Sequence, residues 1–385
     1  MALHFSSDEF ESRKASLLAK MADRKLDAML IFAQETMYWL TGYDTTGFNL
    51  FQCLVLRKDG STDLLTRSAD VRQAEQTSNI GTIHIWADRK KKKASPAVQL
   101  RGLLEKLDLL GCRIGIEYDA HGLTGKDAKT LDDSLKSFAD TEDASRIIPP
   151  LRAIKSGAEI AYTRKAAELT DLAFTEALPL IKAGADEGKI LATMQGVVLE
   201  HGGDYPANHF SIGSSESALL CRYKTGRRTL DAQDQLTIEW SGAFRHYHAP
   251  AMRTLIIGRP SPRHLELYEI AKEALLAVEQ VMRPGHVIGD IFDTHAKVID
   301  EMGAHAHRLN ACGYSVGARF APNWMDWPLI YRGNEYAICP NMTLFAHMII
   351  MDSDEQVAMT LGQTYLTTES EPESLSKLPL ELIVR

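Results

Sequence analysis

Four residues that can take part in acid–base or recognition chemistry lie close together in the middle of the chain. They are Glu239, His246, His248 and Arg253, within LTIEWSGAFRHYHAPAMRTLIIG. The rest of this segment is apolar and β-branched, which predicts two strands joined by a tight turn, with Ser241-Gly242 in the middle. Charged side chains are seldom buried in a sheet unless they are paired or functional. The segment is therefore the first candidate for a site.

Glu239 stands between Ile238 and Trp240 in this segment. An apolar, aromatic setting raises the pKa of a carboxyl group, so Glu239 can act as a general base or nucleophile near neutral pH. The alternative is a structural carboxylate paired with Arg253. The guanidinium of Arg253 is equally suited to bind a substrate carboxylate through two parallel hydrogen bonds, so both interpretations of this residue stay open.

Three histidines are candidates for proton transfer or substrate contact. His246 and His248 are two residues apart, so on a regular strand they share one face. His347 alternates with Phe345 and Ile349 in LFAHMIIM, another predicted strand. Histidine titrates near neutral pH, and we predict catalytic roles for His248 and His347 and a substrate contact for His246. The alternative for each is a histidine held in the core.

Aromatic residues in the last third of the chain are candidates for a substrate-binding wall. Tyr314, Trp324 and Trp327 can present π-faces to a cationic group, and Asp326 lies between the two tryptophans, where it can balance positive charge. The alternatives are loop packing for the aromatic rings and a turn role for Asp326.

The elements that must position these residues form two domains. Residues 1–150 alternate predicted strands, at 26–33 and 112–119, with predicted helices, which indicates an α/β domain. A segment at 146–152, RIIPPLR, is predicted to be an extended linker. Residues 151–385 begin with a helix whose Ser156 and Glu159 form the capping-box pattern. Further helices are expected at 187–201, 264–282 and 288–302, and strands at 342–352 and 357–368, which indicates an α+β domain.

Composition limits the partners. Hydrophobic content of 45% and charged content of 24% are typical of a soluble globular protein, and a net charge of −8 argues against nucleic-acid binding. The basic run 89–93 is interpreted as a solvated loop. Five cysteines without a CxxC pair indicate reduced thiols and a cytoplasmic location, with no zinc site. No apolar run is long enough for a membrane span, so we expect no membrane partner.

Several motifs resemble those of the creatinase/aminopeptidase P/prolidase family. MYWLTGYD is similar to the YLTG stretch of the N-terminal domain, and LRAIKSGAEIAYTRKAAELTD to the helix that opens the catalytic domain. RPGHVIGDI resembles a turn-to-helix motif, and GYSVG falls where the family has GHxxG. The resemblance covers nearly the whole chain. It implies an α/β N-terminal domain at 1–150 and a pita-bread catalytic domain at 151–385. It also implies a homodimer, with the aromatic loop 39–51 closing the partner's site.

The peptidases of this family hold two metal ions on five residues, and this sequence differs at all five positions. The resemblance places Glu239, Pro250, Tyr314, His347 and approximately Gly362 there. Proline and glycine have no ligating side chain, and tyrosine is a poor ligand for hard metals. The resemblance therefore implies a branch that works without a metal or other cofactor.

Two such branches are creatinase and ectoine hydrolase, and IEWSGAFRHYHAPAMRT is most similar to the ectoine hydrolase ribbon, with its Glu-x-x-Gly turn and Tyr-His-x-Pro-x-x-Arg-Thr run. This implies hydrolysis of an amidine- or guanidine-type C–N bond in a small zwitterionic nitrogen compound. Glu239 would attack the carbon or activate water, and His248 or His347 would protonate the departing nitrogen. Arg253 would bind the substrate carboxylate.

One departure concerns the histidine that these relatives carry upstream of the ribbon, since the sequence here reads Leu220-Cys221-Arg222. Three alternatives remain open: a creatinase-like amidinohydrolase, a non-catalytic pita-bread binding protein, and an Xaa-Pro metallopeptidase.

Overall fold

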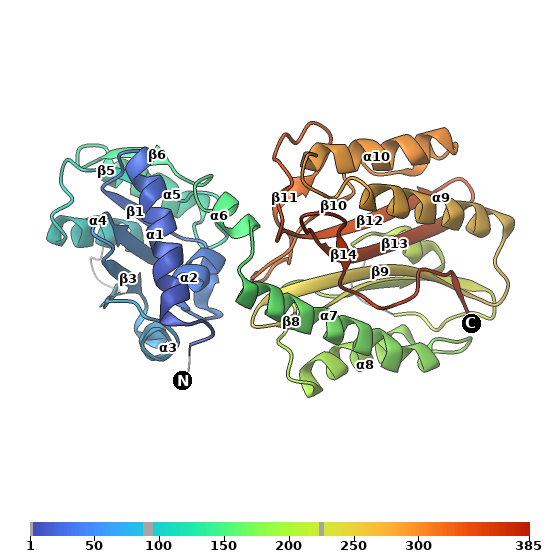
Figure 1. Ribbon diagram of the computed structural model, residues 1–385. Coiled ribbons are helices and arrows are strands. Elements are labelled where there is room, and N and C mark those ends of the chain that lie inside the picture. The colour runs from blue at the N-terminus through green and yellow to red at the C-terminus, as the bar shows by residue number, and fades with distance from the viewer. Residues whose placement is uncertain (1–2, 88–94, 223–226) are drawn as a thin grey trace. The chain divides into compact units, whose positions relative to one another are not determined.

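The computed structural model describes residues 3–87, 95–222 and 227–385, so the basic run 89–93 lies outside the described residues. The chain divides into two compact units, Met1–Arg152 and Ala153–Arg385, and each is described by itself (Figure 1).

The first unit is a mixed sheet with helices on both faces. Its strand order is β4-β3-β2-β1-β5-β6, with β1 antiparallel to β2 and parallel to β5. The strands are β1 Ala28–Ile31, β2 Cys53–Arg57, β3 Thr62–Thr66, β4 Thr82–Ile85, β5 Arg113–Ile116 and β6 Asp140–Asp143. The helices are α1 Ser7–Asp23, α2 Gln34–Thr41, α3 Val71–Thr77, α4 Pro96–Lys106 and α5 Gly125–Leu135.

Alternation along the buried strand β1 explains these two layers. Ala28 and Leu30 pack in one hydrophobic cluster with residues of α4 and α5, whereas Met29 and Ile31 pack in another with residues of α1 and α2. Side chains of a strand alternate between the two faces of its sheet, so a continuous apolar run is expected where both faces are covered. The α/β prediction for this region is confirmed.

The segment at 146–152 was expected to be an extended linker; the boundary between the two units does fall at its end, after Arg152, but the segment is not extended. Residues Pro149–Ala153 form a short helix, α6. Proline is compatible with the first turn of a helix, where its missing N–H has no intrahelical partner.

The second unit is built on one large sheet with the order β11-β10-β12-β13-β9-β8-β7. Its strands are β7 Ser211–Ser214, β8 Asp234–Phe244, β9 Tyr247–Ile257, β10 Gly313–Ser315, β11 Asp326–Ile330, β12 Thr343–Asp352, β13 Val357–Leu366, β14 Glu373–Ser374 and β15 Ile383–Val384. Its helices are α7 Gly157–Ala177, α8 Glu187–Glu200, α9 Pro262–Glu279 and α10 Ile288–Glu301. The expected helices and the capping box of Ser156 and Glu159 are confirmed.

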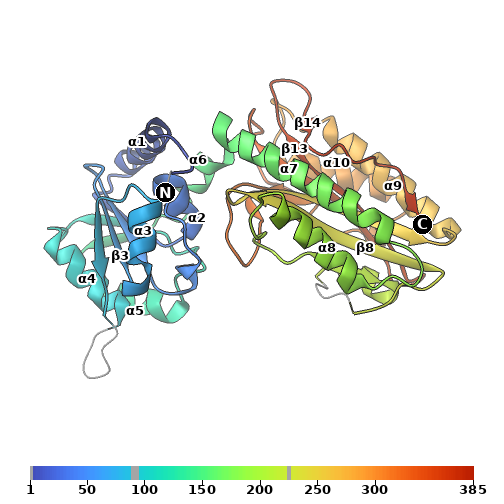
Figure 2. The same ribbon diagram turned by 90° about the horizontal axis from the view of Figure 1, so that it is seen from below.

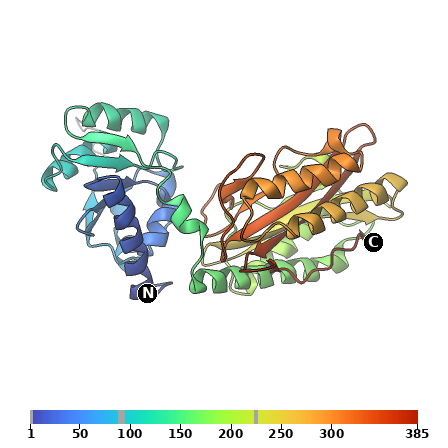
Figure 3. The same cartoon turned by 45° about the horizontal axis from the view of Figure 1, so that its top comes forward.

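Helices α7 and α9 cover the same face of this sheet. Trp240 of β8 donates its indole N–H to the carbonyl oxygen of Thr170 in α7 at 2.9 Å. Leu361 and Tyr365 of β13 pack in one hydrophobic cluster with residues of α9 and α10. Helices α7 and α8 pack side by side, as do α9 and α10 (Figures 2 and 3). The residues that alternate with Trp240, Leu361 and Tyr365 along each strand therefore point to the opposite face of the sheet, away from the helices.

The central ribbon is the expected pair of strands, but its turn lies further along than Ser241 and Gly242. Arg245 and His246 form the turn, with φ values of 52° and 64°. A two-residue turn with positive φ at both positions matches the right-handed twist of paired strands. Gly242 lies within β8. A glycine is needed there because α7 approaches so closely that a Cβ would be 2.1 Å from the carbonyl oxygen of Ala166.

Among the described residues, no helix combines the length and the apolar character that a membrane crossing needs.

Candidate active site

The register of the second sheet gathers polar residues on the face opposite to α7 and α9. Glu239 pairs with Met252, Met252 with Gly362, and Gly362 with His347. Residues directly opposite one another in an antiparallel ladder project to the same face. Tyr314 joins this face because it pairs with Phe345, two residues before His347. Five strands, β8, β9, β13, β12 and β10, thus bring Glu239, His347 and Tyr314 together from positions far apart in the sequence.

A chain of hydrogen bonds connects three of the predicted residues. The indole Nε1–H of Trp324 donates to the hydroxyl oxygen of Tyr314 at 2.8 Å. The Tyr314 hydroxyl in turn donates to Oε1 of Glu239 at 3.3 Å. Trp324 is 1% exposed and Tyr314 is 7% exposed, so both groups depend on each other for hydrogen bonding.

The carboxyl group of Glu239 has an unusual acidity. Its side chain is partly exposed, but the surroundings are apolar, and desolvation raises its pKa from 4.5 to about 7. The hydrogen bond from Tyr314 and the positive charge of Arg222 act in the opposite direction and favour the carboxylate. A carboxyl group with this pKa can exchange protons near neutral pH, which a general base requires.

His347 presents a ring nitrogen with no hydrogen-bond partner among the described residues. This atom is Nδ1, and the side chain is 9% exposed. Its ring centroid lies 5.9 Å from that of Tyr314 and 5.4 Å from that of Phe345. Burial lowers the pKa of His347 to about 4, so the imidazole is neutral at pH 7.

His248 is held differently, by backbone groups on both sides of its ring. Nε2 accepts a hydrogen bond from the backbone N–H of Ala207 at 2.9 Å, which assigns the ring proton to Nδ1. Nδ1 faces the carbonyl oxygen of Gly317 at 3.4 Å. The ring is fully buried, and desolvation lowers its pKa to about 3. This geometry ties two loops to the ribbon and does not support the predicted role of His248 as a proton donor.

Arg253 lies on the other face of the sheet, which corrects the expectation that it binds substrate beside Glu239. It pairs with Ile238 and Leu361, so its side chain points to the side of α7 and α9. Its Nη1 donates to the carbonyl oxygens of Met252 and Gly362, and the side chain is 2% exposed. Arg253 pairs with the residue next to Glu239, and successive residues of a strand face opposite sides of the sheet, so the two side chains point in opposite directions.

Three further predicted residues are not gathered around Glu239. The ring of Trp327 packs edge-on against Tyr336 at 4.4 Å, within the cluster under α9 and α10. Asp326 forms an ion pair with Arg319 at 3.7 Å. His246 lies in the ribbon turn and stacks on Phe320, with 4.1 Å between ring centroids. His246 therefore does not share a strand face with His248, because the turn interrupts the alternation.

Cys221 and Arg222 are closer to the site than sequence reasoning indicated. The charge of Arg222 favours the ionised form of Glu239. Desolvation, and after it the charge of Glu239, raises the pKa of the Cys221 thiol. Arg222 is exposed and Cys221 is half-buried. The signal was present in the sequence, since these residues stand where the related enzymes carry a histidine.

Comparison with known proteins places the chain in a family. The model of metallopeptidase family M24 matches residues 161–369, and that of the creatinase/prolidase N-terminal domain matches residues 13–154. The chain belongs to metallopeptidase family M24. This confirms the resemblance found in the motifs.

Relatives of this M24 protein align over its whole length. Ectoine hydrolase of Halomonas elongata is 26% identical over 406 residues, covering 100% of this chain and 99% of that protein. The Xaa-Pro dipeptidase of Pyrococcus horikoshii is 23% identical and covers 98% and 100%. Both relatives are hydrolases, which supports the expectation of a hydrolase.

Solved structures share the fold. The prolidase of Pyrococcus horikoshii has a TM-score of 0.83 at 21% identity, covering 97% of this chain and 100% of that chain. Dipeptidase PepE of Mycobacterium ulcerans has a TM-score of 0.85 at 19% identity, covering 99% of each chain. The predicted combination of a creatinase-type N-terminal domain and a pita-bread C-terminal domain is confirmed.

The residues present do not fit the two-metal centre that the family name implies. The register brings together the five positions that the resemblance assigns to metal ligands, but Pro250 and Gly362 offer no ligating side chain. Across residues 3–87, 95–222 and 227–385, no three His, Cys, Asp or Glu side chains gather closely enough to hold a metal ion. A two-metal site needs several such donors, so no step is derived through a metal in this M24 protein.

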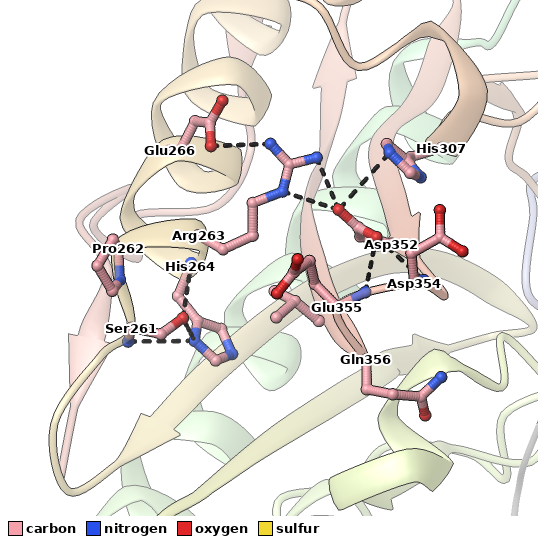
Figure 4. A pocket seen from close by; sticks show the side chains of 11 residues that line it. Ser261, Pro262, Arg263, His264, Glu266, His307, Asp352, Asp354, Glu355 and Gln356 are labelled. Carbon is pink, nitrogen blue, oxygen red and sulfur yellow. Dashed lines mark hydrogen bonds and ion pairs between the residues drawn. The ribbon is translucent and has the colours of Figure 1, made fainter.

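A pocket of about 800 Å³ lies elsewhere, at the turn between β12 and β13 (Figure 4). Several of its charged groups are paired with one another. Arg263 forms ion pairs with Asp352 at 2.7 Å and with Glu266 at 2.8 Å, and His307 lies 3.6 Å from Asp352. This pocket contains none of the residues gathered around Glu239.

Proposed function

We propose that this M24 protein is a metal-independent hydrolase that opens an amidine- or guanidine-type C–N bond in a small zwitterionic nitrogen compound. The observation that carries the proposal is Glu239, a desolvated carboxyl group that is hydrogen-bonded by Tyr314 and stands at a position that the resemblance assigns to a metal ligand. The full-length match to ectoine hydrolase supports a cyclic amidine as first candidate substrate, with creatine-like guanidines second.

The chemistry begins at the carboxylate of Glu239. As general base, it takes a proton from a water molecule whose oxygen bonds to the amidine carbon. One C–N bond then breaks, and the departing nitrogen takes the proton that Glu239 holds. A pKa of about 7 lets one group perform both transfers near neutral pH, because neither protonation state is strongly favoured. In direct attack, the carboxylate instead forms a C–O bond to the amidine carbon, the same C–N bond breaks and the departing nitrogen takes a proton from water; a second water molecule then hydrolyses the anhydride-like intermediate and restores Glu239.

His347 and the aromatic rings orient the substrate in this proposal. A neutral His347, 9% exposed beside Tyr314, lines the substrate site in this proposal, which revises its expected role as proton donor. The rings of Tyr314 and Phe345, with centroids 5.3 Å apart, offer π-faces to the cationic end. Arg222, the cation that acts on Glu239, replaces Arg253 as the partner for a substrate carboxylate.

A turnover screen tests the proposal. Chelator-treated protein is incubated with ectoine, 5-hydroxyectoine, creatine and Xaa-Pro dipeptides, and amine release is measured. We expect turnover of an amidine or guanidine by wild-type protein and by the control Glu371→Gln, which changes an exposed carboxylate in the same unit. We expect a loss of at least about 1000-fold for Glu239→Gln. Hydrolysis restricted to Xaa-Pro dipeptides would favour the peptidase alternative. Binding of a compound without turnover would favour the alternative of a non-catalytic binding protein.

A further inference from the structure

The hydrogen bonds around Tyr314 have only one consistent direction. An indole nitrogen can donate but cannot accept, so Trp324 must be the donor to the Tyr314 oxygen. The hydroxyl of Tyr314 then keeps its own hydrogen for another acceptor, and Oε1 of Glu239 lies 3.3 Å away. The direction of the whole chain is therefore set by Trp324, the residue furthest from the carboxyl group.

Packing limits the alternatives open to these groups. Trp324 is fully buried, with its ring 6.2 Å from that of His248, which is itself tied to two loops. The ring of Tyr314 contacts those of Phe345 and His347. Leaving a buried hydroxyl without hydrogen-bond partners costs free energy. The Tyr314 hydroxyl therefore keeps both hydrogen bonds and does not rotate away from them.

We propose that Trp324 and Tyr314 are positioning residues that hold Oε1 of Glu239 and leave Oε2 as the oxygen that meets water or substrate. The part about the reactive oxygen rests on the proposed function, whereas the hydrogen-bond chain does not. Tyr314 touches Glu239 and Trp324 acts through Tyr314.

The groups that face Glu239 determine the direction in which its pKa changes when the Tyr314 hydroxyl is removed. They are Tyr314 from β10 and Cys221 with Arg222 from the segment before β8, while His347 from β12 lies beside Tyr314 on the same face of the sheet. Among them, Tyr314 makes the hydrogen bond to the carboxyl group and Arg222 contributes a positive charge, and both favour the carboxylate. Removing the Tyr314 hydroxyl therefore raises the pKa of Glu239 further.

Titration of the Glu239 carboxyl group tests the chain without any substrate. The carboxylic-acid band is followed by infrared difference spectroscopy against pH and assigned with Glu239→Gln. We expect Tyr314→Phe to raise the midpoint by about one pH unit, and Trp324→Phe to raise it by less, because the hydroxyl remains but is no longer directed. The matched controls are Tyr336→Phe and Trp327→Phe, an aromatic pair in the same unit that packs apart from Glu239.

A midpoint in Tyr314→Phe equal to that of wild type would overturn the proposal, and so would a shift of similar size in the control variants. Tyr314→Phe removes a single oxygen and decides the matter alone if Trp324→Phe does not fold. Because no substrate enters the titration, a protein that fails the turnover screen can still show the shift. A protein that turns over an amidine without the shift would keep the proposed function and lose this inference.

Discussion

At the scale of single residues, burial decides which groups can exchange protons. Desolvation moves the pKa of Glu239 up to about 7, but moves those of His248 and His347 down to about 3 and 4. The two histidines are therefore both neutral at pH 7. They differ in their partners, since both nitrogens of His248 face backbone groups, whereas Nδ1 of His347 has no partner among the described residues.

The raised pKa of Glu239 predicts opposite pH trends for activity and for stability. Activity that needs the carboxylate should rise with pH through about 7 in kcat/KM. The folded pKa lies above the unfolded value of 4.5, so the stabilising contribution of this group is complete below 4.5 and is lost as pH rises through about 7. Glu239→Gln should therefore raise the melting temperature at pH 8 and change it little at pH 4. If the difference in melting temperature between Glu239→Gln and wild type were the same at pH 4 and pH 8, the raised pKa of Glu239 would be contradicted.

His248→Ala should mainly destabilise the protein. It leaves the N–H of Ala207 without its partner and opens a cavity, and we expect a loss of about 2–4 kcal/mol in the free energy of unfolding. Urea denaturation followed by fluorescence measures this. An unfolding free energy equal to that of wild type would rule out the tether.

His347→Asn is the counterpart, because Nδ1 of His347 holds no structural partner among the described residues. We expect less than about 1 kcal/mol of change in unfolding free energy but a fall of at least about 100-fold in kcat/KM. A variant with full activity would remove His347 from the proposed site.

At the scale of elements, local patterns predicted the helices and strands well, and long-range contacts explain the differences. The capping box of Ser156 and Glu159 is a local signal, and it begins α7 as expected. Gly242 looked like a turn residue, yet its reason is the approach of α7, which no local pattern records. The face of Arg253 and the partners of His248 depend in the same way on strand register and on distant backbone groups.

Substitutions at two glycines in the second unit can distinguish a glycine required by a long-range contact from one that is not. Gly242→Ala places a Cβ 2.1 Å from the Ala166 carbonyl oxygen, so α7 must shift, and we expect at least about 2 kcal/mol of destabilisation in urea denaturation. Gly196 in α8 has no neighbouring atom within 4 Å of an added Cβ. Gly196→Ala should therefore stabilise the protein by about 0.5–1 kcal/mol. Equal effects of the two substitutions would contradict the packing explanation of Gly242.

At the scale of the whole molecule, family membership establishes the fold, and we propose that the side chains at five positions decide the chemistry. The M24 and creatinase-type models together match most of the chain, and solved peptidases share the fold. These positions were identified from the sequence alone, because motif spacing is preserved even where residue types differ. Their geometry needed the sheet, which brings residues from β8, β9, β10, β12 and β13 together.

The resemblance also predicts a homodimer, which light scattering after size-exclusion chromatography can test. We expect a particle of twice the mass of one chain that persists on dilution to micromolar concentration. A particle with the mass of a single chain under these conditions would contradict this prediction.

The most direct measurement of the central claim compares turnover of ectoine, with creatine in parallel, by chelator-treated protein and by the same protein supplied with Mn²⁺. We predict equal rates in both states for wild type, and none in either state for Glu239→Gln. Turnover that appears only after Mn²⁺ is added, and that survives in Glu239→Gln, would contradict a mechanism based on this carboxyl group.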